Sequence, residues 1–259
     1  MGNDSVTMMP RRLLLPAALL AISATTTPAT ATPPRTASTS ESRPVYAHRG
    51  GTSSFVENTR ANYAHAAAHG SLLWETDVRF TRTNYPVLLH DADLRRFRCS
   101  STRIATVSVS AARACKAANG QTLTTLNEFV TDLKARRAQA FIELKTVPTA
   151  AQWAILQTRI STIKSRIVIE SFLPAALVAA SRKGYRTAFL TSTSVPPSGL
   201  PSGTDWYAPE WTTITAARVR AMHAAGVKVV GWTVPCSEWA GLPAGVDALI
   251  SNDLVRDCS

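Results

Sequence analysis

The segment AFIELKTVPTAAQWAILQTRISTIKSRIVIESF, residues 140–172, contains the pattern that decides the fold. Two short runs rich in β-branched and aromatic residues, 140–145 and 167–172, enclose a stretch with helical spacing at 149–161. A strand, a helix and a second strand in this order predict two parallel strands, because a parallel pair needs a long crossover connection. The segment therefore indicates an α/β protein.

The same alternation extends through residues 44–259. Seven more strand-like runs are found at 45–48, 72–78, 86–90, 186–190, 206–209, 227–234 and 248–251, and further helical stretches at 59–70, 124–138, 172–184 and 215–226. Eight or nine strands in about 215 residues predict a single-domain (β/α)₈ TIM barrel. An open doubly wound sheet is the competing fold, but the G-x-G-x-x-G fingerprint that it often contains is absent.

One connection is too short for a helix. Only eight residues separate Asp77 from Pro86, fewer than a crossover helix requires. We therefore expect a short connection without a helix between the second and third strands. If both strands are parallel, the chain must return as an extended segment with a tight bend near Asn84.

The N-terminus has the features of an export signal. Arg11 and Arg12 precede an apolar run, and Ala29-Thr30-Ala31 supplies a cleavage site, so residues 1–31 are predicted to be a secretory signal peptide. The paired arginines leave both the general and the twin-arginine routes open. Residues 32–43, rich in Ser, Thr and Pro, are predicted to be a disordered linker. We expect a secreted protein, and no segment after Ala31 is long and apolar enough to cross a membrane.

The four cysteines agree with export. An even number of cysteines in a secreted chain indicates two disulfides, and three pairings are possible. We favour Cys99–Cys115 and Cys236–Cys258, because each pairing closes a local loop. A zinc site is the alternative, but the chain contains no C-x-x-C pair.

The chain is strongly basic. Its formal net charge is +11, and removal of the signal peptide, with two arginines and one aspartate, leaves +10. A basic surface attracts anionic partners such as envelope polymers or phospholipid head groups. The arginines are scattered and are not interleaved with aromatic residues, so we expect no nucleic-acid partner. We expect a monomer.

Polar residues gather where the predicted strands end. His48 and Arg49 follow the first strand, Glu75 and Asp77 lie in the second, His90 and Asp91 end the third, and Glu143 and Lys145 end the fourth. In a barrel these strand ends converge on one rim. Glu75, Asp77 and Glu143 would form an oxygen-ligand site for a hard divalent cation, Ca²⁺ or Mg²⁺. Glu57, Glu170 and Trp232 are further candidates to line the pocket or to support these residues.

The order of these residues resembles a known family. His48-Arg49-Gly50, Glu57-Asn58-Thr59, Glu75-Thr76-Asp77, Val87 to Asp91, Ile142 to Lys145 and Trp232-Thr233-Val234 together resemble the glycerophosphodiester phosphodiesterase family, in its secreted bacterial type. The resemblance covers residue 44 to about residue 253. It implies a (β/α)₈ phosphodiesterase that hydrolyses glycerophosphodiesters to sn-glycerol 3-phosphate and an alcohol. It further implies His48 and His90 as the acid–base pair, Arg49 and Lys145 as phosphate-binding residues, and one divalent cation, with Ca²⁺ expected and Mg²⁺ as the alternative, held by Glu75, Asp77 and Glu143.

Two departures and two rival functions accompany the resemblance. The usual Thr-Lys-Asp-Gly turn of the family is Thr81-Arg82-Thr83-Asn84 here, and asparagine tolerates the left-handed conformation that glycine provides. Pro235 replaces the asparagine that often follows W-T-V.

A phospholipase-D-like enzyme of the same barrel type, acting on lysophospholipid or sphingomyelin, shares the same residues. A non-catalytic envelope-binding barrel is a further alternative, although binding alone would not need both histidines.

Overall fold

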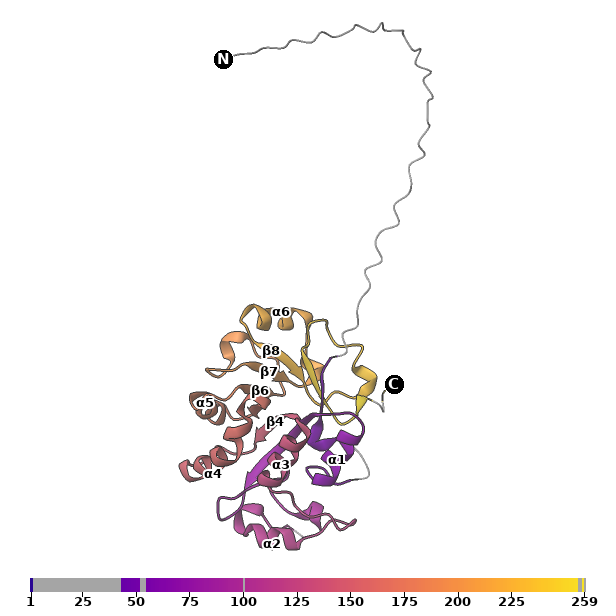
Figure 1. Ribbon diagram of the computed structural model, residues 1–259, viewed down its shortest axis with the longest axis vertical. Coiled ribbons are helices and arrows are strands. Elements are labelled where there is room, and N and C mark those ends of the chain that lie inside the picture. Colours follow the sequence, from indigo (N-terminus) through magenta and orange to yellow (C-terminus); the bar gives the residue numbers. More distant parts are fainter. Residues whose placement is uncertain (2–42, 52–54, 100, 256–257, 259) are drawn as a thin grey trace. The chain divides into compact units, whose positions relative to one another are not determined.

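Eight parallel strands close into a barrel, as the alternating sequence predicts. They are β1 (Val45–Ala47), β2 (Leu73–Phe80), β4 (Gln139–Leu144), β5 (Ile167–Ser171), β6 (Thr187–Thr191), β7 (Trp206–Pro209), β8 (Lys228–Gly231) and β9 (Ala248–Ser251). Each strand pairs in parallel with its neighbour, and β1 pairs with both β2 and β9, which closes the sheet. Figure 1 shows the helices outside this barrel. The fold is a single-domain TIM barrel.

The computed structural model describes residue 1 and residues 43–51, 55–99, 101–255 and 258. The predicted signal peptide, apart from Met1, and all but the last residue of the predicted linker lie outside these described residues. The residues from Glu41 onward form one structural unit.

The interior of the barrel is apolar toward the amino ends of the strands and polar toward their carboxyl ends. Inward-facing Tyr46, Phe141, Val168 and Trp206 belong to one buried cluster. Phe141 packs edge-on against Tyr46, with ring centroids 4.6 Å apart, and against Trp206, with centroids 5.5 Å apart. Because side chains alternate along a strand, the residues two positions after Phe141 and Val168 face inward again. Those residues are acidic, and they lie toward the carboxyl ends of the strands.

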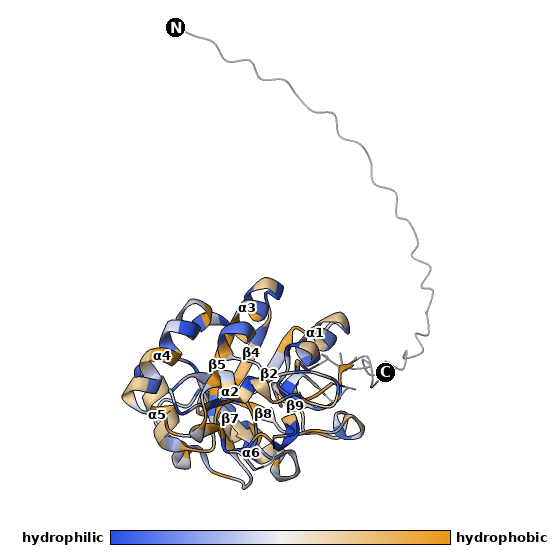
Figure 2. Ribbon diagram, turned by 90° about the horizontal axis from the view of Figure 1, so that it is seen from below, coloured by the Kyte–Doolittle hydropathy of each residue, from blue (hydrophilic) through white to orange (hydrophobic). Residues whose placement is uncertain are grey.

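The helices cover the outside of the barrel. They are α1 (Arg60–Ala68), α2 (Val109–Ala114), α3 (Leu126–Arg136), α4 (Ala150–Ile160), α5 (Pro174–Arg182) and α6 (Ala216–Ala224). Threonine side chains cap the amino ends of α1, α3, α4 and α6, which satisfies backbone N–H groups left unpaired at a helix start. In Figure 2 the hydrophobic colour is concentrated in the central strands and hydrophilic residues lie on the surrounding helices and loops.

The third predicted strand is not part of the barrel. The strand β3 (Pro86–Leu88) runs antiparallel to the end of β2, with Val78 opposite Leu88 and Phe80 opposite Pro86. The connection has no helix, as predicted, but a parallel third strand is ruled out because so short a loop can only reverse the chain. The bend falls at Asn84, whose φ of 60° is left-handed. His90 accordingly lies two residues beyond the end of β3.

Residues 92–122 form a small excursion beside the barrel. It contains the short 3₁₀ helices η2 (Arg95–Phe97) and η3 (Ile104–Thr106) and the helix α2, which lies at the edge of the molecule in Figure 1. Its apolar residues form a separate cluster that includes Phe97 and Ile104. The Cys99–Cys115 disulfide closes the excursion, which confirms that predicted pairing.

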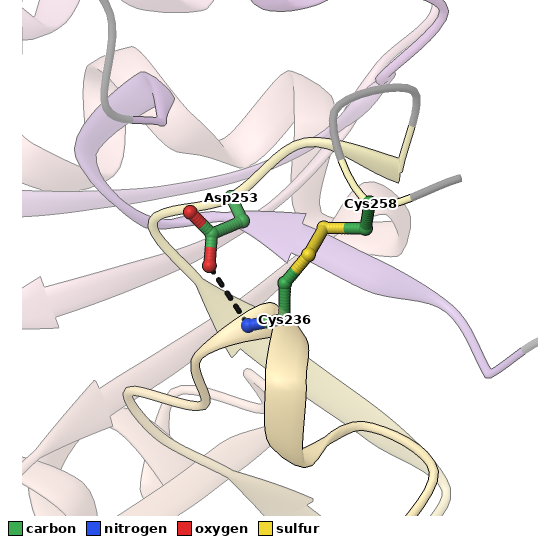
Figure 3. A group of neighbouring side chains, drawn as sticks. All are labelled: Cys236, Asp253 and Cys258. Carbon is green, nitrogen blue, oxygen red and sulfur yellow. Dashed lines mark hydrogen bonds between the residues drawn. A yellow bond between two sulfur atoms is a disulfide. The ribbon is translucent and has the colours of Figure 1, made fainter.

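The second predicted disulfide, Cys236–Cys258, is also present. It links the 3₁₀ helix η7 (Cys236–Glu238) to the segment that follows β9. Asp253 supports the same junction, since its carboxylate accepts a 2.8 Å hydrogen bond from the backbone N–H of Cys236 (Figure 3). Both sulfurs are therefore engaged in a covalent bond, so this group of residues is structural.

Among the helices of the described residues, none combines the length and the apolar character that a membrane span requires.

Candidate active site

Three acidic residues of neighbouring strands form one row across the inside of the barrel. In the sheet register, Asp77 of β2 lies opposite Glu143 of β4, and Glu143 lies opposite Glu170 of β5. Glu75 lies two residues before Asp77 and points to the same face of β2. All four side chains are buried, with at most 7% of any of these residues exposed. Strand pairing alone therefore brings residues 77, 143 and 170 together.

Glu75, Asp77 and Glu143 can hold a metal ion. One carboxylate oxygen from each lies within 4.8 Å of one oxygen from each of the others. Asp77 Oδ1 is buried and has no hydrogen-bond partner among the described residues. Carboxylate oxygens are the ligands that Ca²⁺ and Mg²⁺ prefer. A buried oxygen that accepts no hydrogen bond from the described residues, within three converging carboxylates, fits a divalent cation.

The pKa values of these carboxylates are shifted by burial and by their neighbours. Burial, together with Asp77, raises the pKa of Glu75 well above its usual range and raises the pKa of Glu143 to about 7. Burial acts in the same direction on Asp77, but Arg49 and Lys145 hold the pKa of Asp77 below its ordinary value. Buried carboxylates that lie close together repel one another more strongly than they would in water. A bound cation would favour the ionised form of all three.

Two basic side chains border the carboxylates. Lys145 Nζ lies 2.9 Å from Glu143 Oε1 and 3.5 Å from Asp77 Oδ1. Arg49 Nε lies 3.2 Å from Asp77 Oδ2, and its Nη1 lies 3.1 Å from Glu57 Oε2. The structure thus places both predicted phosphate-binding residues at the rim. Glu57 does not line the central cavity; it lies behind Arg49 and orients it.

His48 begins the 3₁₀ turn η1 (His48–Gly50) that follows β1. Its Nδ1 is 2.7 Å from Asn252 Oδ1, so Nδ1 carries the proton of the neutral ring. Its Nε2 lies 3.8 Å from Glu75 Oε2, beyond hydrogen-bond distance. Burial, reinforced by the charge of Arg49, lowers the pKa of His48 to about 4. A neutral ring with an available Nε2 lone pair can accept a proton.

His90 reaches the same cavity by a different route. Because β3 runs back along β2, the backbone N–H of Leu89 donates to the carbonyl of Asp77 at 3.0 Å, which brings His90 to the level of the carboxylates. His90 Nδ1 lies 2.9 Å from Asp91 Oδ1. The Asp91 carboxylate accepts a hydrogen bond from Nδ1–H, which leaves Nε2 directed away from Asp91. The antiparallel hairpin, rather than a barrel strand, therefore positions the second histidine.

Arg96 links the two histidine-bearing segments and was not predicted. Its Nε lies 3.1 Å from Asp91 Oδ2 and 3.1 Å from Glu57 Oε1. Glu57 in turn pairs with Arg49, so a chain of alternating charges runs from Arg49 to Asp91, the residue that contacts His90. Arg96 belongs to the excursion closed by Cys99–Cys115, and nothing in its local sequence distinguishes it from the other scattered arginines.

Asn58 is a second residue whose role was missed. It is 1% exposed, and its Nδ2 donates to Asp77 Oδ2 at 2.7 Å. Its Oδ1 accepts hydrogen bonds from the hydroxyls of Tyr63 (3.1 Å) and Thr76 (2.9 Å). These bonds fix the orientation of the Asp77 carboxylate. The E-N-T motif was the available signal for Asn58, and its last residue, Thr59, caps α1.

A cavity of about 120 Å³ opens between these groups. His48, His90, Glu75, Glu143, Lys145 and Glu170 line its polar side. Phe172, Leu190 and Trp232 line its apolar side, and Trp232 packs edge-on against Phe172 with ring centroids 5.3 Å apart. Trp232 Nε1 donates to the carbonyl of Ala208 at 2.8 Å, so the polar N–H of the indole is occupied and its apolar surface faces the cavity. The cavity suits a ligand with an anionic group and a carbon skeleton.

Comparisons with known proteins agree with this geometry. The sequence profile of the "Glycerophosphoryl diester phosphodiesterase family" matches residues 48–256. The chain is 29% identical over 249 residues to the Mycobacterium tuberculosis protein named "Probable glycerophosphodiester phosphodiesterase 2", covering 83% of this chain and 90% of that protein. It is 30% identical over 142 residues to mouse glycerophosphodiester phosphodiesterase 1, covering 51% of this chain and 43% of the mouse protein.

Solved structures share the fold at lower identity. An Oleispira antarctica phosphodiesterase in complex with the product sn-glycerol-3-phosphate superposes with a TM-score of 0.71 at 22% identity, over 82% of this chain and 94% of that chain. A glycerophosphodiester phosphodiesterase from Parabacteroides distasonis superposes with a TM-score of 0.70 at 21% identity, over 83% and 94% of the two chains.

Proposed function

Because this chain belongs to the glycerophosphoryl diester phosphodiesterase family, we propose that it is a secreted enzyme that hydrolyses glycerophosphodiesters to sn-glycerol 3-phosphate and an alcohol with the help of a divalent cation. The observation that supports the proposal most directly is that His48, His90, Glu75 and Glu143 line one cavity at the barrel rim, with the Asp77 carboxylate next to those of Glu75 and Glu143. A binding protein would need the basic residues but not two histidines held in different hydrogen-bonded states.

The cation would be held by Glu75, Asp77 and Glu143. Such an ion neutralises phosphate charge and polarises the phosphoryl group when bound. We propose Ca²⁺, because it accepts several carboxylate ligands in flexible geometry, whereas Mg²⁺ usually keeps most of its waters and binds through one or two carboxylates. Arg49 and Lys145 would add positive charge beside the phosphate, and the planar guanidinium of Arg49 matches the geometry of phosphate oxygens.

The two histidines would divide the proton transfers. His48, with Nδ1–H held by Asn252, would accept the proton of the attacking hydroxyl at Nε2. His90, with Nδ1 held by Asp91, would donate a proton to the oxygen of the departing alcohol as its bond to phosphorus breaks. The attacking hydroxyl is either that of the neighbouring glycerol carbon, which gives a cyclic phosphate that water then opens, or water itself. On the direct route these two transfers complete the reaction. On the cyclic route they form the ring, and the reverse transfers open it: His90 would accept a proton from water, and His48 would return its proton to the glycerol hydroxyl.

Export is supported by two independent features. Residues 1–31 have the basic, apolar and cleavage regions of a signal peptide. The two disulfides favour an oxidising compartment, because disulfides are rare in proteins that remain in a reducing cytoplasm. The mass of the protein recovered from the culture medium should correspond to cleavage after Ala31.

The deciding experiment is incubation of the purified enzyme with a panel of glycerophosphodiesters that differ in their alcohol. A lysophospholipid and sphingomyelin, the substrates of the rival activity, are assayed beside this panel. We expect sn-glycerol 3-phosphate from the glycerophosphodiesters, loss of activity in a chelator, and its return with Ca²⁺ or Mg²⁺. Undiminished hydrolysis by metal-stripped enzyme would refute the carboxylate site, and turnover of the lysophospholipid alone would favour the phospholipase-D-like alternative.

A further inference from the structure

A fourth buried carboxylate, Glu170, lines the cavity without a partner. The residue is 1% exposed, and its Oε2 has no hydrogen-bond partner among the described residues. A buried polar atom without a partner is costly unless something outside the protein satisfies it. Glu170 faces the same cavity as Glu75 and Glu143. Its unpaired oxygen therefore points to a ligand in that cavity.

The sheet register places Glu170 beside a predicted cation ligand. Its Cα is paired with that of Glu143 on the adjacent strand, so the two side chains stand next to each other on the inner face of the barrel. Its oxygens are not part of the group in which the oxygens of Glu75, Asp77 and Glu143 approach one another within 4.8 Å. Glu170 thus extends the acidic row by one strand and lies farther from the centre of the cation site than the other three.

The basic residues at the cavity are already engaged elsewhere. Lys145 contacts Glu143 and Asp77, and Arg49 contacts Asp77 and Glu57. Among the ion pairs of the described residues, neither Glu75 nor Glu170 has a lysine or arginine partner; Glu75 receives only the backbone N–H of Arg49 and lies 3.8 Å from His48. Glu75 and Glu170 thus lack a direct contact with a lysine or arginine side chain among the described residues, and a cation in the cavity would supply one positive partner for both.

We propose that Glu170 is a fourth acidic residue of the cation site, which raises the affinity of the enzyme for the divalent ion through its charge and its unpaired oxygen. This role rests on the metal dependence in the proposed function. A carboxylate outside the ligand group acts on the ion at longer range than a ligand does, and removing such a supporting group typically weakens metal binding roughly 10- to 100-fold.

The test is calorimetric titration of chelator-treated protein with CaCl₂ and, separately, MgCl₂, without substrate. Glu170→Gln keeps the size of the side chain and removes its charge, and we expect it to weaken binding of the ion roughly 10- to 100-fold. Glu143→Gln, at a predicted ligand, should weaken binding at least as much. Glu210→Gln is the matched control, because Glu210 follows β7 at the same end of the barrel but does not line the cavity; it should leave binding unchanged.

Thermal unfolding gives a second readout. Without cation, Glu170→Gln should unfold at the same or a higher temperature than the wild type, because the change removes a buried carboxyl group whose Oε2 has no partner among the described residues. Saturating Ca²⁺ should then raise its unfolding temperature less than it raises that of the wild type. If Glu170→Gln is not recovered folded, Glu170→Ala replaces it in both measurements.

The outcomes separate the two proposals. Failure of the wild type to bind either ion would refute the metal dependence and this inference together. Tight binding by the wild type with unchanged affinity in Glu170→Gln would leave the proposed function standing and overturn the role of Glu170. Unchanged ion affinity with a raised KM would overturn it as well, and would assign Glu170 to the substrate.

Discussion

At the scale of single residues, the two histidines are distinguished by the groups that hold them. His48 is bound by a neutral amide oxygen, and His90 by a carboxylate. We predict that His48→Ala and His90→Ala each lower kcat by at least about 10², the scale expected when an acid or base is removed. His223→Ala is the control, since His223 pairs with Asp247 on the outside of the barrel. Near-full turnover in both active-site variants would rule out the assignment.

Asn58 offers a test of how the Asp77 carboxylate is oriented. Asn58→Asp preserves the shape of the side chain and its tolerance of a φ of 59°, but replaces the N–H donor that faces Asp77 Oδ2 with an oxygen. We expect divalent-ion affinity and kcat/KM to fall roughly 10- to 100-fold, as when other groups that orient metal ligands are removed. Ion titration and steady-state kinetics measure the two effects.

Tyr63→Phe serves as the companion variant for Asn58. It removes the hydroxyl whose one proton is shared between Asn58 Oδ1 and the carbonyl of Glu75, while the bond between Asn58 and Asp77 remains. It should lower the free energy of unfolding by about 1–2 kcal/mol and change ion affinity little. Equal losses of affinity in the two variants would indicate that Asn58 acts through general packing rather than through Asp77.

At the scale of secondary-structure elements, the alternation of strands and helices was sufficient to predict the barrel. Glu75, Asp77 and Glu143 could be placed together from the sequence. Side-chain alternation fixes which face of the sheet each one occupies, and strand order fixes how far along the barrel each one lies. The antiparallel direction of β3 was not anticipated, since the periodicity of residues 86–90 is the same for either direction. The short connection and Asn84 were the available signals for a hairpin. Arg96 could not be placed because its position depends on how residues 92–122 fold back.

The start of α3 gives a prediction about pH. The carboxylate of Glu128 accepts hydrogen bonds from the backbone N–H and hydroxyl of Thr125 at 2.9 and 2.8 Å. Burial raises the pKa of Glu128, but these bonds and Arg113 outweigh it and lower the pKa below its ordinary value. A lowered folded-state pKa contributes stability above the unfolded-state pKa of about 4.3, and that contribution is lost as the pH falls through the folded-state pKa.

Glu128→Gln should therefore lower the free energy of unfolding by about 0.5–1 kcal/mol at neutral pH, the scale for a charge at a helix amino terminus. The difference from the wild type should shrink as the pH falls below about 4. Urea unfolding of the wild type and of Glu128→Gln, from neutral pH to below about pH 4, measures this difference in unfolding free energy. The equivalent residue of α4 is Gln152, which makes the same capping bonds without a charge. The effect of Gln152→Ala should not vary with pH, and a constant effect of Glu128→Gln would contradict the assignment.

At the scale of the whole molecule, acidic and basic residues are distributed differently. The chain has 28 Lys and Arg residues against 17 Asp and Glu residues, and Glu75, Asp77, Glu143 and Glu170 are buried at the cavity. The surface is consequently more basic than the net charge alone indicates. A positively charged protein surface raises the rate at which anionic substrates arrive.

This distribution predicts that salt affects substrates according to their charge. Raising the ionic strength from about 0.01 M to about 0.15 M shortens the screening length from about 30 Å to about 8 Å. We expect kcat/KM for a net anionic substrate, glycerophosphoglycerol, to fall several-fold over this range. Glycerophosphocholine carries a compensating positive charge, so its kcat/KM should fall less. Both substrates are assayed with saturating Ca²⁺, which keeps occupancy of the cation site constant. Equal salt dependence for the two would show that salt acts on the enzyme itself, and the surface charge would then have no part in guiding the substrate.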